Sequence, residues 1–427
     1  MTPTAAGLLQ QEARALLARL TRVRPFSLVA PMPVAAMPPG GALAEVERSL
    51  VAGRSQMREW VHGFLRWLAS QRGQTASDAE GQSRFARLRL RFNAVLSECD
   101  LLGEAVTQRS EHETGVLLAG LDAAAADALA LPDYYQPPPL MCYLDRGVGA
   151  AIRRAGTRLP SGAASPVAVI RIPRERMVGS GLAASLFHEV GHQAAALLGL
   201  VDTLKAALRA HRPPGHAFAW RLFEQWIGEI LSDFWACARL GVGATLGLIG
   251  TLSLPRSLVF AFHPAEVHPV PWLRVRLSCA IGRRLFVDPQ WTAVERLWTS
   301  LYPATGLDAG LQRLFQRVLD AMPAFVSVLA AHRPPALRGR TLVQVLDVDS
   351  RRPERLQALL ESWRQTPERL YCAAPSLAFA VISQARARGQ LTPEEESHLL
   401  TRLLTHWALR GAAGASAALP IPRPIAA

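Results

Sequence analysis

The strongest constraint in the sequence is a His-Glu-x-x-His motif, His188 to His192, set in an apolar stretch. Apolar residues recur every three or four positions from Leu182 to Leu197, which is the spacing of a helix with one buried face. Residues four apart share a face of a helix, so both imidazoles can bind one metal ion. Glu189 then lies beside that ion, where its carboxylate can take a proton from a bound water. A chance match is the alternative, but two histidines and a carboxylate are costly to bury without partners.

A second helical segment offers the third protein ligand that a zinc site of this kind needs. Its apolar face is spaced mainly at four-residue intervals from Phe218 to Phe234. Glu229 and Asp233 are four residues apart and therefore project together. We expect Glu229 to be the third ligand and Asp233 to accept the other ring N–H of a zinc-bound histidine. Glu224 is the rival ligand, but no acidic residue follows it four positions later.

Taken together, the two motifs resemble those of the gluzincin metallopeptidases, the thermolysin-like clan, over about residues 165–285. The resemblance implies that Zn²⁺ is bound by His188, His192 and Glu229. It further implies that Glu189 is the general base and that Asp233 binds the ring of His188. The sequence shows no counterpart of the tyrosine and histidine that stabilise the oxyanion in thermolysin, so the resemblance leaves that role unassigned.

A His-Pro pair followed by an arginine-bearing helix comes after the second motif, with His268 and Arg274 as its polar residues. This order is similar to what several His-Glu-x-x-His peptidase families carry. The similarity implies that His268 is an oxyanion donor or a substrate contact and that Arg274 is an orienting charge near the site. The alternative is that both residues cap the helix and pair with a carboxylate. The sequence leaves the two interpretations open.

A short β-branched run bounded by prolines, Val167 to Ile172, is predicted to be a strand just before the motif helix. In gluzincins an edge strand at this place binds the substrate backbone by strand addition. By resemblance, Val169, Ile170 and Arg171 would then be substrate-binding residues. An interior strand is equally compatible, because the sequence does not distinguish an edge strand from a central one.

Helical periodicity dominates the rest of the chain, and the predicted fold class is mainly α with a small β element, an α+β zincin core. We predict a helical N-terminal domain over 1–131, with a Pro-rich connector over 25–41. The zincin-like core is expected over 132–286 and a helical C-terminal region over 287–410. Ala- and Pro-rich residues 411–427 are expected to be a disordered tail.

The charge balance shows a basic excess without a basic block. Lys and Arg number 47 against 34 Asp and Glu, which gives a net charge of +13, and the excess is distributed along the helices. Such a distribution is typical of solvated helix faces, so a nucleic-acid partner is not expected. An anionic surface remains an alternative partner.

Cysteine usage and hydropathy indicate a cytoplasmic protein. The five cysteines are widely spaced and contain no Cys-x-x-Cys, which argues against a disulfide framework and against a thiolate zinc site. Polar residues interrupt the apolar N-terminal residues, so no secretory signal is predicted. The uncharged stretch from Leu240 to Pro255 is shorter than the roughly 20 residues of a spanning helix, and no transmembrane segment is expected.

The predicted function is that of a zinc-dependent peptidase that hydrolyses a peptide or protein substrate with a metal-activated water and Glu189 as base. The long helical flanks offer a surface for a protein partner. Two alternatives from other classes are a non-catalytic scaffold stabilised by zinc and an adaptor in which the motif is accidental. A metal-free protein would favour the last of these.

Overall fold

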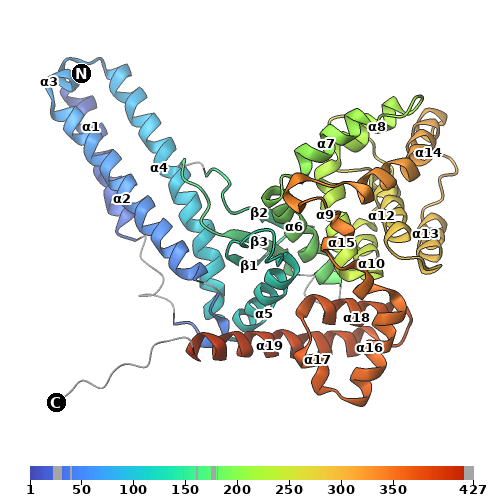
Figure 1. Ribbon diagram of the computed structural model, residues 1–427. Helices are drawn as coiled ribbons and strands as arrows, with labels where there is room; N and C mark the ends of the chain where they lie inside the picture. Colours follow the sequence, from blue (N-terminus) through green and yellow to red (C-terminus); the bar gives the residue numbers. More distant parts are fainter. Residues whose placement is uncertain are drawn as a thin grey trace, which may run out of the picture.

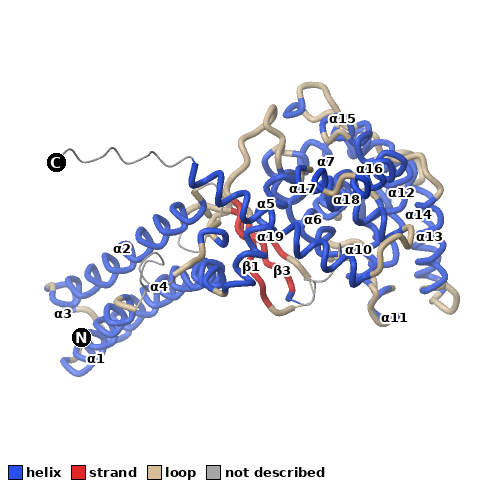
Figure 2. The backbone as a smooth tube through the Cα atoms, turned by 90° about the horizontal axis from the view of Figure 1, so that it is seen from below, coloured by secondary structure: helices blue, strands red, loops and turns tan. Residues whose placement is uncertain are grey.

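The structure is a computed structural model that describes residues 1–22, 31–38, 41–147, 149–159, 162–174, 179 and 181–417. Over these residues the chain is mainly helical with one three-stranded sheet, which confirms the prediction of a mainly α fold with a small β element. Long N-terminal helices form an arm that projects from a larger helical body, and the sheet lies where the two meet (Figure 1, Figure 2).

The arm consists of three long helices and a short one: α1 (Pro3–Leu20), α2 (Ala42–Ala69), α3 (Gln71–Thr75) and α4 (Asp78–Thr107). They pack around their own apolar core, in which Phe64 of α2 meets Phe85 of α4. This core continues onto Met141 and Val169 of the sheet, so the arm is anchored on one sheet face. The predicted Pro-rich connector falls partly on residues 25–30 and 39–40, which lie outside the described residues; its remaining part includes the 3-10 turn η2 (Val34–Ala36).

The sheet contains β1 (Leu140–Asp145), β2 (Ala151–Arg153) and β3 (Ala168–Pro173), in the order β1-β3-β2. β3 is parallel to β1 and antiparallel to β2. It is therefore the central strand, and the prediction of strand addition at Val169, Ile170 and Arg171 is wrong, because both sides of these residues are already paired. The outer strand next to the motif helix is β2, whose three residues are too few to give a periodic signal in the sequence.

Buried side chains close the other edge of the sheet. The Gln108 side chain donates to the Leu144 carbonyl and accepts from the Leu144 amide, both at 2.7 Å. Arg109, fully buried and ion-paired with Asp122 at 2.7 Å, donates to the Cys142 carbonyl, and Asp122 accepts from the Cys142 amide. The β1 edge thus has its polar groups satisfied by side chains. In the described chain no further strand pairs with β2.

The motif helix α6 (Gly181–Leu197) crosses α9 (Ile227–Leu240) at very short range. A Cβ atom at Gly191 of α6 would lie 2.8 Å from the Ser232 Cα, so only glycine allows this approach. The remaining body helices around them are α5 (His112–Leu129), α7 (Leu200–Ala210), α8 (Ala217–Gln225), α10 (Val242–Leu252), α11 (Arg256–Val259) and α12 (Pro271–Leu285), with the 3-10 turn η3 (Gln108–Ser110) before α5. The crossing sets the spacing between the side chains that α6 and α9 direct at each other.

The C-terminal part of the chain is helical, as predicted: α13 (Gln290–Leu301), α14 (Ala309–Ala331), α15 (Leu342–Val345), α16 (Pro353–Gln365), α17 (Glu368–Cys372), α18 (Pro375–Ala387) and α19 (Pro393–Ala417), with 3-10 turns η5 (Pro335–Leu337) and η6 (Val348–Arg351). One apolar cluster runs from Leu118 of α5 to Trp407 of α19, so α5 packs with the body and the predicted boundary at 131 coincides with no break in packing. α19 extends to Ala417, seven residues past the end predicted at Arg410, and the predicted tail beyond it, 418–427, lies outside the described residues.

One described helix, α14, has the length and apolar composition of a membrane-spanning segment. It is held in the body by aromatic contacts. Phe325 stacks on Phe223 of α8, with ring centroids 4.1 Å apart, and Phe315 stacks on Trp272 of α12 at 5.5 Å. Of its most apolar 18-residue segment, 44% is buried inside the structure.

Candidate metal centre

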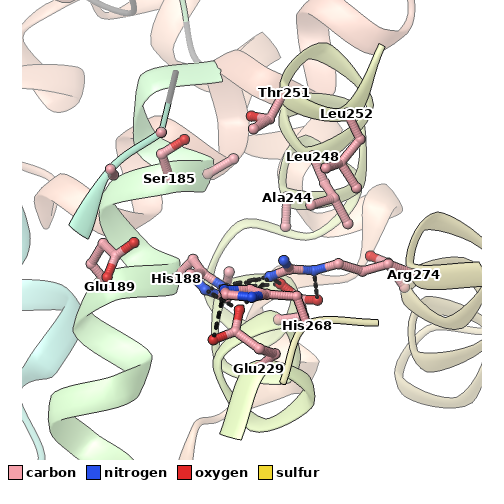
Figure 3. A pocket seen from close by; sticks show the side chains of 16 residues that line it. Ser185, His188, Glu189, Glu229, Ala244, Leu248, Thr251, Leu252, His268 and Arg274 are labelled. Atoms are coloured by element: carbon pink, nitrogen blue, oxygen red, sulfur yellow. Dashed lines mark hydrogen bonds and ion pairs between the residues drawn. The ribbon is translucent and has the colours of Figure 1, made fainter. Parts of the chain in front are cut away.

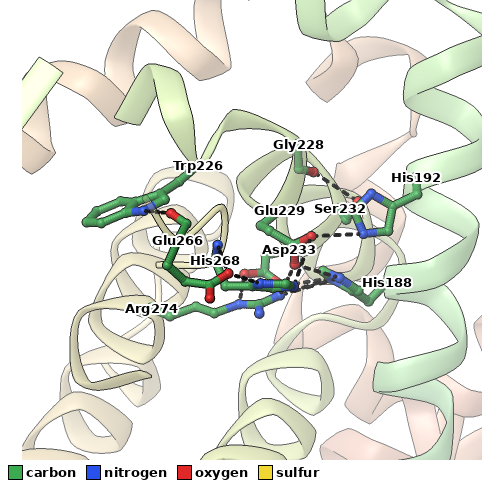
Figure 4. Close-up of polar contacts among 10 residues, drawn as sticks. All are labelled: His188, His192, Trp226, Gly228, Glu229, Ser232, Asp233, Glu266, His268 and Arg274. Atoms are coloured by element: carbon green, nitrogen blue, oxygen red, sulfur yellow. Dashed lines mark hydrogen bonds and ion pairs between the residues drawn. The ribbon is translucent and has the colours of Figure 1, made fainter. Parts of the chain in front are cut away.

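The crossing of α6 and α9 brings together the three predicted metal ligands. His188 Nε2 lies 3.3 Å from Glu229 Oε2, and His192 Nε2 lies 3.3 Å from Glu229 Oε1 (Figure 4). One candidate ligand atom from each of the three residues lies within 4.8 Å of the others. Two ligand atoms at about 2.1 Å from a tetrahedral zinc ion are separated by about 3.4 Å. Both nitrogen–oxygen distances therefore fit a shared zinc ion, and the donor set is one that Zn²⁺ prefers.

Asp233 lies one helical turn after Glu229 and binds the other nitrogen of the first imidazole. His188 Nδ1 donates to Asp233 Oδ1 at 2.8 Å. This bond orients the ring so that Nε2 faces Glu229, where loss of the Nε2 proton would free a lone pair for a metal ion. The pairing of Asp233 with His188 that the sequence predicted is confirmed.

Arg274 of α12 connects the two carboxylates of α9. Its Nε donates to Asp233 Oδ2 at 2.7 Å, and its Nη2 lies 2.9 Å from Asp233 Oδ1 and 3.1 Å from Glu229 Oε2. The arginine is buried, as are both acids for the most part. Arg274 thus pairs with the carboxylate of Asp233, as one interpretation of the sequence predicted. Because Asp233 orients His188, Arg274 is also an orienting charge near the site, as the other predicted.

The pKa values in this cluster reflect burial opposed by close charges. Burial by itself would raise the pKa of Asp233, but the charges of Arg274 and His188 outweigh it and hold the pKa below 3.8. Burial likewise acts to raise the pKa of Glu229, and hydrogen bonds from His188 and His192 lower it far below its usual range. Burial acts to lower the pKa of His188, and the charge of Asp233 raises it to about 9. Both carboxylates are therefore ionised near neutral pH, as metal binding and ring orientation require.

Glu189 adjoins His188 on α6, and both side chains line one cavity beside the candidate ligands (Figure 3). Its side chain is largely buried. Among the described residues its carboxylate takes part in no hydrogen bond or ion pair, unlike Glu229 and Asp233. A carboxylate in this setting is available to accept a proton.

His268 lies in the loop between α11 and α12, with Nε2 3.6 Å from Glu229 Oε1. Its Nδ1 contacts Glu266 at 2.7 Å, which directs Nε2 toward the metal ligands. Gln225 and Trp226 hold the loop by donating to the Glu266 carbonyl at 2.7 and 3.2 Å. The loop therefore places His268 at the rim of the site, and no side chain of it caps α12, whose N-cap is Val270.

The rival ligand Glu224 is occupied elsewhere. It forms an ion pair with Arg209, and Arg212 lies 4.0 Å away from it. No contact joins Glu224 to the histidines in the described structure. The helical spacing of the sequence favoured Glu229, and the structure agrees.

Two hollows share His188 and Glu229 in their linings, and His192 lines only the second of them. A cavity of about 200 Å³ extends between α6, α10 and α12 (Figure 3). A more open groove of about 510 Å³ runs along residues 150–154, which include β2, and past His192 to His268. The groove exposes the outer strand of the sheet beside the candidate metal site.

Sequence reasoning missed three residue groups here. β2 was too short to predict, and Glu266 carries no motif. Gln193 follows the second histidine and is almost fully buried, where its Oε1 accepts from the Ala155 amide at 2.9 Å and fixes the chain after β2. A glutamine on the buried face of an apolar helix was the available signal, because a buried amide needs a partner.

Comparison of the chain with protein-family models, with curated proteins and with solved structures yields no match.

Proposed function

We propose that this protein is a zinc-dependent peptidase. The observation that carries the proposal is the pair of 3.3 Å separations between the Glu229 oxygens and the Nε2 atoms of His188 and His192. They leave one tetrahedral position for a water, as in catalytic rather than structural zinc sites. The Asp233 and Arg274 contacts support it, because ligands with fixed partners keep their geometry without the ion.

Bound Zn²⁺ would supply a Lewis acid and a water of lowered pKa. In the proposed reaction Glu189 takes one proton as the water oxygen adds to the scissile carbonyl carbon. The C–N bond then breaks, and Glu189 delivers the proton to the leaving amine. The second water proton passes from the new carboxyl group to the amine, so the products are a carboxylate and an ammonium ion, and atoms and charge balance. His268 is proposed as the donor to the developing oxyanion, because its Nε2 faces the candidate ligands from the rim.

The substrate backbone is proposed to lie along β2 in the open groove. β2 is the outer strand next to Glu189 and His192, and the opposite edge of the sheet is closed by Gln108, Arg109 and Asp122. An extended peptide paired with β2 would pass over the candidate ligands. This assignment replaces the one predicted for β3.

A cytoplasmic location is part of the proposal. All five cysteines are free and four of them are buried, as is usual for proteins of a reducing compartment. A peptide or protein is the proposed substrate, and the projecting arm of α1, α2 and α4 is the proposed surface for a protein partner.

The test is hydrolysis of a diverse peptide mixture by zinc-loaded protein, read by mass spectrometry of the products. Wild type is expected to produce new termini, and Glu189→Gln is expected to be slower by about 10²–10⁴-fold, the usual contribution of a general base. Equal rates for the two proteins would contradict the role of Glu189. A wild type that binds zinc and cleaves nothing would instead indicate a zinc-stabilised scaffold.

A further inference from the structure

One face of α10 forms the apolar wall of the cavity between α6, α10 and α12. Ala244, Leu248, Thr251 and Leu252 recur on that face at helical spacing, and they line the cavity opposite Ser185 of α6 (Figure 3). Ala184 of α6 lines the same cavity. Two candidate metal ligands, His188 and Glu229, lie with Arg274 at the other end of the cavity. A group bound near the candidate metal site therefore has this apolar space on one side, which we name the α10 pocket: Ala184, Ser185, Ala244, Leu248, Thr251 and Leu252.

Close contacts hold α10 in place beside α6. A Cβ atom at Gly247 would lie 2.3 Å from the Ala184 Cβ, so the two helices touch there through backbone and a methyl group. On the other side Thr245 and Ser278 of α12 share a buried hydrogen bond of 2.7 Å. The pocket wall is thus fixed from two directions, and the space persists because neither helix can move in to fill it.

The size of the cavity limits what the α10 pocket can hold. The whole cavity measures about 200 Å³. On the same measure a water needs only roughly 10–15 Å³, so a metal ion and a water would leave most of this space free. An apolar cavity of roughly 150 Å³ accommodates benzene. The remaining space suits a side chain such as leucine or methionine.

The charges around the cavity argue against a charged occupant. Arg274 is the cation at the inner end, and its Nε and Nη2 are engaged by the carboxylates of Asp233 and Glu229. An acidic side chain would therefore lose water beside a cation whose charge two carboxylates already balance, and a basic one would meet the apolar face of α10. A neutral apolar group is the occupant that this lining favours.

We propose that the α10 pocket receives the side chain of a substrate residue directly beside the scissile bond and selects leucine- or methionine-sized apolar residues there. The inference rests on the proposed peptidase function. Ala244 and Leu248 are its specificity-determining residues, because they form the wall at the midpoint of α10. A glycine at this substrate position would leave the pocket empty, and a tryptophan would exceed it.

The experiment is cleavage profiling with a peptide library in which the residues on both sides of one potential scissile bond are varied. Zinc-loaded wild type should cleave peptides with Leu or Met at one of these positions at least about tenfold faster than those with Gly, Asp or Lys. Ala244→Leu fills the pocket and should shift the preference toward Ala and Gly by a similar factor. Leu248→Ala enlarges it and should shift the preference toward Phe.

Leu246→Ala is the matched control, since Leu246 is on α10 but does not line the cavity. It should keep the wild-type preference, and zinc content should be equal in all variants. Active variants with an unchanged preference, or a wild type with no preference at either position, would overturn the assignment to the α10 pocket. A zinc-loaded wild type that cleaves no peptide overturns the peptidase proposal itself, and the specificity proposal with it.

Discussion

Arg274 of α12 binds Asp233 of α9 with two nitrogens, Nε to Oδ2 at 2.7 Å and Nη2 to Oδ1 at 2.9 Å. Asp233 in turn holds His188, so one bidentate ion pair orients an imidazole on a third helix. The same guanidinium reaches Glu229 at 3.1 Å. Helices α6, α9 and α12 are thereby joined at the candidate metal site through polar contacts as well as apolar packing.

Arg274→Ala would leave Asp233 and Glu229 buried without their cation. Loss of one partner from a buried ion pair costs about 3–5 kcal/mol, and we expect that decrease in the free energy of unfolding with zinc chelated. Urea denaturation followed by circular dichroism measures it. Added zinc should recover part of the loss, because the ion compensates Glu229. Arg284→Ala, at an exposed position of the same helix, is the control and should change little.

Asp233→Asn would remove the anionic acceptor of His188 Nδ1–H while keeping the size of the side chain. Loss of such a partner typically weakens metal binding by about 10–100-fold. Titration against a zinc chelator of known affinity gives the dissociation constant. Asp202→Asn on the exposed face of α7 is the matched control. An unchanged affinity in Asp233→Asn would show that His188 needs no orienting carboxylate.

Gly191→Ala would introduce a Cβ atom 2.8 Å from the Ser232 Cα at the crossing of α6 and α9. The helices must separate, which should lower the free energy of unfolding by about 1–3 kcal/mol. The shift should also pull His192 away from Glu229 and weaken zinc binding. Gly63→Ala is the comparison, since a Cβ atom there meets nothing within 4 Å; it should stabilise α2 by about 0.5–1 kcal/mol. A stable, zinc-binding Gly191→Ala protein would contradict the close crossing.

His332 links stability to pH, because burial lowers its pKa below the value of 6.5 for the exposed group. As the pH falls through 6.5, the unfolded chain takes up a proton at this residue while the folded one resists it. Stability should therefore decrease on acidification. His332→Gln, which preserves a polar group near Thr203, should show a smaller decrease between pH 7.5 and pH 5.5 in urea titrations. Parallel pH curves for the two proteins would rule out this contribution.

The candidate ligands were predictable from the sequence because helical geometry is local. Four-residue spacing places His188 with His192 and Glu229 with Asp233, whatever the rest of the fold does. The contact between the two pairs depends on the close crossing of α6 and α9. Gly191 allows this crossing, but a glycine in a helix does not by itself identify the helix that packs against it.

The position of a strand within a sheet could not be predicted in the same way. Val169, Ile170 and Arg171 belong to a central strand because β1 and β2 pair with β3 on its two sides. The residue types of β3 do not determine whether a second strand pairs with it. The end of α19 was also misplaced. Alanine, the strongest helix former, continues the helix past Gly411 and Gly414 to Ala417.

The most direct test of the proposed function is zinc content, measured by elemental mass spectrometry on protein purified without a metal-affinity tag. Wild type should carry about one zinc per chain, and His188→Ala and Glu229→Ala should lose it, because each removes one of three protein ligands. Glu224→Ala, the variant of the rival acid, should keep it. Wild type that stays metal-free when zinc is supplied, or a Glu229→Ala protein that keeps its zinc, would contradict the site formed by His188, His192 and Glu229.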